Sequence, residues 1–177
     1  LEKPRVDAAI GMQVTPDIEA GRFFVASGGV TSSPSWFEIA ITGRGGHASY
    51  PEQCIDPLKV GHYIYEKISA LEATYRERQA VISVTMFHGG ETQNVISETC
   101  QMAGTVRTFS ENQTETIRAA LVDVCRKAEE NSGARVEIAF RTSMNSVYNQ
   151  SDMAERMRRV IDRELGTDAL ETKPWVF

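Results

Sequence analysis

The stretch that decides the fold reads Trp36-Phe37-Glu38-Ile39-Ala40-Ile41-Thr42 and continues into the turn Gly43-Arg44-Gly45-Gly46-His47-Ala48-Ser49. In the first part, Phe37, Ile39 and Ile41 recur at the two-residue period of a strand with one buried face. The glycines of the turn allow positive φ angles and a close approach of the backbone to a ligand. We therefore expect a strand that ends in a turn presenting His47 at an exposed edge, which makes this histidine a candidate for a functional site.

Two helices and three more strands are expected after this turn. Asp56 and Pro57 are an N-cap and first-turn pair that begins one helix. Ser110–Gln113 is a capping box that begins the second helix, which ends at Gly133. Alternating apolar residues and flanking turn residues predict the further strands at 80–87, 100–108 and 136–140.

The order of these elements over residues 34–143 is strand, helix, strand, strand, helix, strand. It predicts the α+β class and a ferredoxin-like βαββαβ domain, in which two helices cover one face of a four-stranded antiparallel sheet. An edge strand of such a sheet has unpaired backbone groups that must be covered or paired. Pairing with a two-fold-related copy would satisfy them, so we expect a homodimer through the sheet edge.

The two ends of the chain, 1–33 and 144–177, are expected to be pieces of a second domain into which this sheet unit is inserted. The first piece is predicted to hold two short strands, at 8–14 and 23–26. The second is predicted to hold a helix that is capped by Ser151 or Asp152 and stopped by Gly166.

Composition excludes several classes of protein. Of the 177 residues, 41% are hydrophobic and 24% are charged, as in soluble globular proteins, and no apolar run approaches the ~20 residues of a membrane span. The formal net charge of −5 argues against a nucleic-acid partner. Three scattered cysteines fit reduced thiols, so we expect a cytoplasmic location. The chain opens on Leu1 without a signal peptide and is expected to be part of something longer.

Asn94 and Arg107 are further candidates for a binding site. Asn94 lies in a loop, where an asparagine either forms a turn or donates its amide to a carbonyl or carboxylate. Arg107 lies in a strand, where its guanidinium is either a solvated outer-face group or a carboxylate binder. The spacing alone leaves these alternatives open. His62 and His88 have no partner at a metal-ligand spacing and are interpreted as structural.

Four motifs follow one another over residues 36–140: Gly43–Pro51, Ile55-Asp56-Pro57, Gly89-Gly90 with Asn94-Val95-Ile96, and Gly104–Thr108. In this order and with these separations they resemble the M20 family of metallopeptidases. The match is closest to its amidohydrolase branch, which includes hippurate hydrolases and N-acyl-amino-acid amidohydrolases. The resemblance covers most of the chain.

In that family the six-element unit is a lid or dimerisation domain inserted into a zinc-binding catalytic domain. The resemblance implies that His47 reaches across a dimer into the partner's active site and stabilises the oxyanion formed when a metal-bound water attacks the amide. It implies that Asn94 and Arg107 bind the carboxylate end of an N-acyl amino acid or small peptide. The implied cofactor of the parent protein is a divalent metal, zinc first, with manganese, cobalt or nickel as alternatives.

The resemblance also shows what is missing. The family's Cys-Gly-His-Asp-like segment, paired-glutamate motif and late histidine have no match here, so we expect this chain to lack the metal site and to be inactive alone. Gln13 stands where the amidohydrolase branch carries a metal-binding histidine. An amide oxygen is a poorer zinc ligand than imidazole, so metal binding in the parent is expected to be weakened, altered or lost unless another residue fills the position.

Two other interpretations stay open. Gln13 favours a non-catalytic relative that only binds acyl amino acids or peptides, or only assembles. A free-standing ligand or RNA module is a weaker interpretation, because the chain is acidic and no exposed aromatic pair is expected on a central strand.

Overall fold

The computed structural model describes residues 6–142 and 145–171, and the chain divides into two compact units. The larger unit comprises Gly29–Tyr148. The smaller unit combines Leu1–Gly28 with Asn149–Val176, the two ends of the chain. Two short strands, β1 (Gly28–Thr31) and β8 (Val147–Asn149), pair with each other where the chain passes between the units, and the sequence did not predict them.

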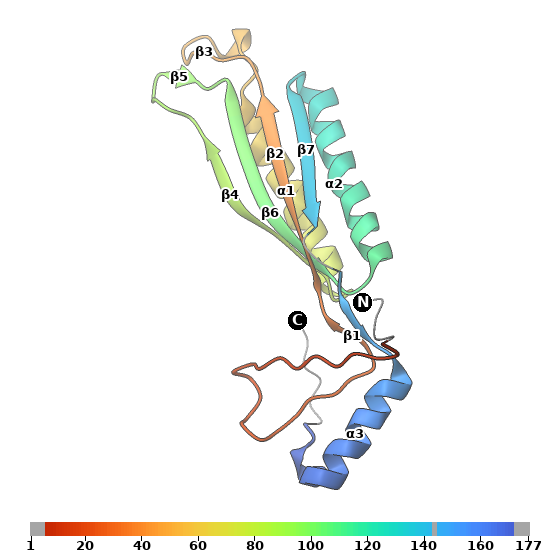
Figure 1. Cartoon of the computed structure of the whole chain (residues 1–177). Helices are drawn as coiled ribbons and strands as arrows, with labels where there is room; N and C mark the ends of the chain where they lie inside the picture. The colour runs from red at the N-terminus through yellow and green to blue at the C-terminus, as the bar shows by residue number, and fades with distance from the viewer. Residues whose placement is uncertain (1–5, 143–144, 172–177) are drawn as a thin grey trace. The chain divides into compact units, whose positions relative to one another are not determined.

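The larger unit is built on one four-stranded antiparallel sheet. Its strands are β2 (Ser33–Thr42), β4 (Val81–Gly89), β6 (Thr99–Thr108) and β7 (Arg135–Thr142), in the spatial order β4-β6-β2-β7. Figure 1 shows helices α1 (Pro57–Arg76) and α2 (Glu111–Ser132) lying together on one face of this sheet. The predicted α+β class and the antiparallel sheet are therefore confirmed.

Local sequence explains where the two helices begin and end. A side-chain oxygen of Asp56 accepts the Leu58 N–H at 2.9 Å, and the Ser110 hydroxyl accepts the Gln113 N–H at 3.3 Å. In a capping box the Gln113 side chain would accept the backbone N–H of Ser110. Here the Gln113 amide oxygen accepts the N–H of Phe109, one residue earlier. Helix α2 ends at Gly133, whose φ of 71° is readily adopted only by glycine.

The core lies between the sheet and the two helices. Alternate residues of β2, namely Phe37, Ile39 and Ile41, are at most 2% exposed, as their spacing predicted. They pack with fully buried residues of both helices, including Ile64 and Leu121. Burial of each such side chain contributes about 1.5–3 kcal/mol to folding, so this layer holds the larger unit together.

The other face of the sheet carries no helix in the described part of the chain, and we call it the open face. Its cross-strand neighbours follow from the strand register, which is interrupted in β4 by a bulge between Val84 and Met86. The side chains on the open face are Val81, Ser83, Met86 and His88 on β4, Gln101, Ala103, Thr105 and Arg107 on β6, Pro34, Trp36, Glu38 and Ala40 on β2, and Arg135, Glu137, Ala139 and Arg141 on β7.

The smaller unit agrees with the sequence only in part. Helix α3 (Ser151–Leu165) is present, although its N-cap is Gln150 and not Ser151 or Asp152. The described residues show no strand at 8–14 or 23–26, and the pairing among them in these segments is an isolated bridge between Phe23 and Leu170. A strand needs a neighbouring strand for its backbone, and the described residues place none beside 8–14, which leaves Ile10, Met12 and Val14 at 68%, 83% and 92% exposure.

None of the helices in the described residues combines the length and the apolar character that crossing a membrane requires.

Candidate functional site

The glycine-rich turn folds back on the segment before α1 and on the loop before β6. A side chain at Gly43 would collide with the carbonyl oxygen of Ile55, to which the backbone N–H of Arg44 donates at 2.9 Å. A Cβ at Gly46 would lie 2.7 Å from the Cys54 sulfur. The glycines are therefore required by close packing, and that packing fixes the backbone that carries His47.

His47 lies in β3 (Gly46–His47), which pairs with β5 (Val95–Ile96) at the tip of the larger unit (Figure 1). Its side chain is exposed, and its Nδ1 accepts the backbone N–H of Ser49 at 3.1 Å. An accepting Nδ1 places the proton of the neutral imidazole on Nε2, which becomes a hydrogen-bond donor. The imidazole can thus offer an N–H to an oxygen atom of a ligand.

Asn94 lies beside His47 because of the β3–β5 pairing. Its backbone carbonyl accepts the Ala48 N–H at 3.0 Å, and its side-chain oxygen accepts the Thr92 hydroxyl at 3.2 Å. The side chain is exposed, and within residues 6–142 and 145–171 its NH2 group has no hydrogen-bond acceptor. The structure therefore brings two of the predicted site residues together at the tip.

Arg107 lies elsewhere. It is on the open face near the far end of β6, opposite Pro34 of β2 and Val81 of β4. The tip joins the other end of β6, at Thr99, so eight residues of extended chain, about 26 Å, separate that end from Arg107. Within one chain, Arg107 cannot act on the same small ligand as His47.

Gln13, the predicted metal position, is exposed in the smaller unit in a segment without strand structure. The described residues contain no group of three or more His, Cys, Asp or Glu side chains that could hold a metal ion. A zinc centre needs three or four such ligands, so these residues do not make up a metal site by themselves.

The remaining histidines and cysteines are outside the candidate site. His62 faces Glu66 at 3.7 Å on the surface of α1, and His88 is exposed on the open face. Burial raises the pKa of the Cys125 thiol to about 12 and is also the main cause of the raised pKa of Cys100, with the charge of Asp56 second. Both thiols stay protonated and unreactive at neutral pH.

The β4 edge of the sheet is apolar. Between Val81 and Gly89 it has no Lys, Arg, Asp or Glu, and Val81, Met86 and Phe87 are 40–52% exposed. The ring of Tyr65, from α1, stacks on Phe87 with 6.1 Å between the ring centroids, which extends the apolar surface onto the helix. Sequence reasoning missed this surface, although the absence of charge in this strand was a readable signal.

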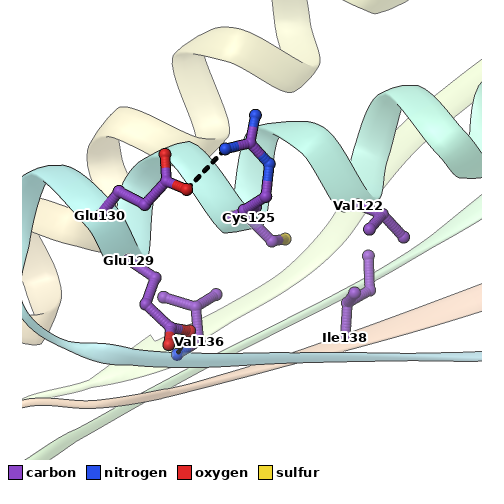
Figure 2. A pocket seen from close by; sticks show the side chains of 7 residues that line it. Val122, Cys125, Glu129, Glu130, Val136 and Ile138 are labelled. Atoms are coloured by element: carbon purple, nitrogen blue, oxygen red, sulfur yellow. Dashed lines mark hydrogen bonds and ion pairs between the residues drawn. The ribbon is translucent and has the colours of Figure 1, made fainter.

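The β7 edge is charged and partly covered. Arg135 pairs with Glu137 at 2.8 Å, and the Val136 N–H donates to a carboxylate oxygen of Glu129 on α2 at 2.9 Å. Figure 2 shows the groove between α2 and β7, with Glu129 directed toward Val136 and with Val122 of the helix facing Ile138 of the strand. Charges and a capped N–H are features that keep an edge strand from pairing with another chain.

Comparison with known proteins identifies the family. Residues 32–133 match the family model described as peptidase dimerisation domain, that of the M20 peptidases, which is more than half of the chain. The chain belongs to the M20 family. It is 30% identical over 175 residues to the N-acyl-L-amino acid amidohydrolase of Geobacillus stearothermophilus, covering 95% of the chain and 47% of that protein. It is 27% identical over 170 residues to the N-acetyldiaminopimelate deacetylase of Bacillus subtilis, covering 94% and 46%.

Solved structures with a similar fold include one from the M20 family. A Bacillus subtilis protein described as a dinuclear metal binding peptidase from the M20 family superposes with a TM-score of 0.67 at 28% identity, covering 84% of this chain and 36% of that one. A structure from methicillin-resistant Staphylococcus aureus reaches a TM-score of 0.75 at 21% identity, covering 88% and 42%, which shows the fold alone. This M20 chain spans about half the length of the curated relatives it matches.

Proposed function

We propose that this chain is the ferredoxin-like lid and dimerisation part of a metal-dependent amidohydrolase that cleaves the amide bond of N-acyl amino acids or small peptides. The observation that carries the proposal is the position of His47 and Arg107 at opposite ends of one sheet. An amide and a carboxylate of one small substrate cannot contact both residues of the same chain, so a two-chain site accounts for both.

The β4 edge provides the geometry for such a site. Antiparallel pairing of two β4 strands about a two-fold axis places Gly89 of one protomer beside Val81 of its partner. The tip with His47 and Asn94 follows Gly89 along the chain, and Arg107 is the cross-strand neighbour of Val81. The pairing therefore brings the tip of each protomer to the Arg107 end of the other. It also covers the apolar surface of Val81, Met86 and Phe87.

Each residue has a definite role in this site. The Nε2–H of His47 donates to the oxygen that gains negative charge when the amide carbonyl is attacked. Arg107 binds the carboxylate of the amino acid through the two parallel N–H groups of its guanidinium, and the Asn94 amide assists as a neutral donor. The bond from Ser49 holds the imidazole in the donating tautomer, so the proton need not be relocated during the reaction.

The metal belongs to the part of the protein outside this chain, and it supplies the activation of water when bound. The family relative described as a dinuclear metal binding peptidase supports a divalent metal. We expect zinc first, because it suits the amide hydrolysis that we propose. The described residues do not form a metal site, so we expect the 177-residue chain alone to bind no metal tightly and to be inactive. Three free cysteines, two of them buried, support a cytoplasmic location.

The deciding experiment measures hydrolysis by the full-length protein. With zinc or manganese present, kcat/KM for N-acetyl amino acids should fall by about two to three orders of magnitude in His47→Ala, the usual cost of removing an oxyanion donor. His62→Ala is a matched control on an exposed helix surface and should leave the rate unchanged. Full activity of His47→Ala would refute the assigned role.

Gln13 supports a second candidate, a non-catalytic relative that binds acyl amino acids without hydrolysing them. Metal analysis of the full-length protein separates the two candidates. A stoichiometric metal together with turnover excludes the binder, whereas binding of N-acyl amino acids without metal or turnover excludes the hydrolase.

A further inference from the structure

One end of the open face has two arginines on either side of an exposed tryptophan. Arg107 of β6 lies opposite Pro34, and Arg141 of β7 lies opposite Trp36, two residues further along β2. The guanidinium of Arg141 lies over the Trp36 indole, 5.6 Å from its centroid. All three side chains are on the same face of the sheet, and the indole is 36% exposed.

Neither guanidinium is neutralised by its neighbours. In the part of the chain that the structure describes, no carboxylate pairs with Arg107 or Arg141. The open-face acids lie further along the strands: Glu38 follows Trp36 by two residues, and Glu137 is engaged by Arg135 at 2.8 Å. This end of the open face is therefore a local excess of two positive charges in a chain whose net charge is −5.

The spacing of the two arginines selects a class of ligand. They lie on β6 and β7, one on each side of β2, and two residues apart along the strands, which puts their Cα atoms about 12 Å apart. Both side chains are long enough to reach inward across Trp36, which leaves room for a ligand with two carboxylates. The Trp36 indole holds the Arg141 guanidinium on the sheet surface by a cation–π contact.

We propose that Trp36 and Arg141 form, next to Arg107, a subsite for the second carboxylate of an N-acylated dicarboxylic amino acid. This inference rests on the proposed function for Arg107 and adds Arg141 and Trp36 as residues that determine specificity. Arg107 binds the α-carboxylate, Arg141 binds the side-chain carboxylate, and Trp36 covers the methylene groups between them. The preferred substrates of the full-length protein are then N-acyl glutamate or N-acyl aspartate.

The test compares N-acetylglutamate with N-acetylglutamine, which has almost the same shape but lacks the second charge. The full-length, metal-loaded protein should prefer the glutamate derivative by about tenfold or more in kcat/KM, as expected for a charge-assisted hydrogen bond. Arg141→Gln should reduce this ratio to near one. Arg107→Gln should lower both rates. Arg135→Gln, which removes an arginine from the same strand and face, should not change the ratio.

A binding measurement decides the inference independently of turnover. Tryptophan fluorescence is titrated with both compounds in the wild type, Trp36→Phe and Arg141→Gln, with the melting temperature of each protein checking its fold. We expect tighter binding of N-acetylglutamate, a signal change that is absent in Trp36→Phe, and loss of the preference in Arg141→Gln. Equal affinity of the wild type for both compounds overturns the inference. Hydrolysis of N-acetylglutamate and N-acetylglutamine at equal rates also overturns the inference, but it leaves the proposed function intact. If neither compound is hydrolysed and the binding preference for N-acetylglutamate is preserved, only the proposed function is refuted.

Discussion

The two edges of the sheet differ in chemistry although they belong to the same small domain. The β4 edge is uncharged and is continued by exposed apolar side chains, including Phe87 and the Tyr65 ring that stacks on it. The β7 edge has an ion pair along the strand and a carboxylate, from Glu129, on the backbone N–H of Val136. The β7 edge is protected against pairing and the β4 edge is not, which favours β4 as the edge of the proposed dimer.

This difference matters for the site as well as for assembly. A dimer through β7 would place the tip of each protomer far from Arg107 of its partner, because β7 and the Arg107 strand β6 are separated by β2. In a dimer through β4, only β4 itself lies between Arg107 and the interface of the two protomers. The apolar edge and the divided site residues therefore favour the same arrangement.

The largest effect is expected when charge is placed on the β4 edge. The double variant Val81→Lys, Met86→Lys should raise the dimer dissociation constant by about 100-fold or more, because four like charges would be brought together on neighbouring strands across the two-fold axis. Sedimentation velocity over a range of concentrations measures it. Val122→Lys on the β7 side has similar exposure and should leave the dimer unchanged. An unchanged dimer in the double variant together with a dissociated Val122→Lys dimer would reverse the assignment of the edges.

A smaller effect is expected where β4 is held to the sheet. Gly104 lies opposite Val84, and a Cβ there would collide with the Ser83 carbonyl and the Phe37 ring. Gly104→Ala should reduce the free energy of unfolding by about 1–3 kcal/mol, measured by urea denaturation. Ala139→Ser on β7 changes an exposed open-face position and should stay within about 0.5 kcal/mol of the wild type. Equal stability of the two variants would show that the Gly104 contact can relax.

The hydrogen bond from the Val136 N–H to Glu129, on the β7 edge, should contribute less to stability than the close packing at Gly104. Glu129→Ala removes the acceptor of the Val136 N–H and should lower stability by about 0.5–1.5 kcal/mol while speeding hydrogen exchange of that amide. The neighbouring variant Glu130→Ala breaks only an exposed ion pair with Arg126 and should cost about 0–0.5 kcal/mol. Unchanged exchange at Val136 in Glu129→Ala would mean that the carboxylate does not protect the edge.

The smallest expected effect is a pH-dependent change in stability that comes from the exposed surface of α2, the helix that flanks β7. Hydrogen bonds from Lys127, and then from Arg126, hold the pKa of the exposed Asp123 carboxyl below its ordinary value. Because the folded pKa is the lower one, the stabilisation is present above the unfolded pKa and is lost as the pH falls through the folded value. Asp123→Asn should therefore unfold slightly earlier than the wild type in urea at pH 7, and this difference should vanish at pH 2. A difference that grows at low pH would contradict the sign.

The sequence predicted most of the sheet unit because each strand has one buried face. Phe37, Ile39 and Ile41 show this period clearly, and it recurs in β6 and β7. In β4 the bulge between Val84 and Met86 interrupts the period, and the strand covers Val81–Gly89 where 80–87 was predicted. Strands as short as β3 and β5 have no detectable period, and the pairing that brings Asn94 to His47 was therefore invisible.

The site residues were predictable as residue types but not as a constellation. A glycine-rich turn singles out His47, and the strand period places Arg107 on the outer face, but neither pattern gives the length of sheet between them. Trp36 and Arg141 were missed because they belong to different strands, and only the register of β2 with β7 makes them neighbours. At 8–14 and 23–26 the sequence pattern suits a strand, but no strand of the described residues lies beside these segments.

The ladder between β3 and β5 is only two residues long, so the tip can open without unfolding the sheet beneath it. Opening of this ladder would break the hydrogen bond from the Ala48 amide to the Asn94 carbonyl and release the backbone that positions His47. The hydrolysis rate that we propose for the full-length protein would then scale with the fraction of molecules in which the ladder is formed. The hydrogen-exchange protection of the Ala48 amide, which donates to the Asn94 carbonyl, would measure that population directly.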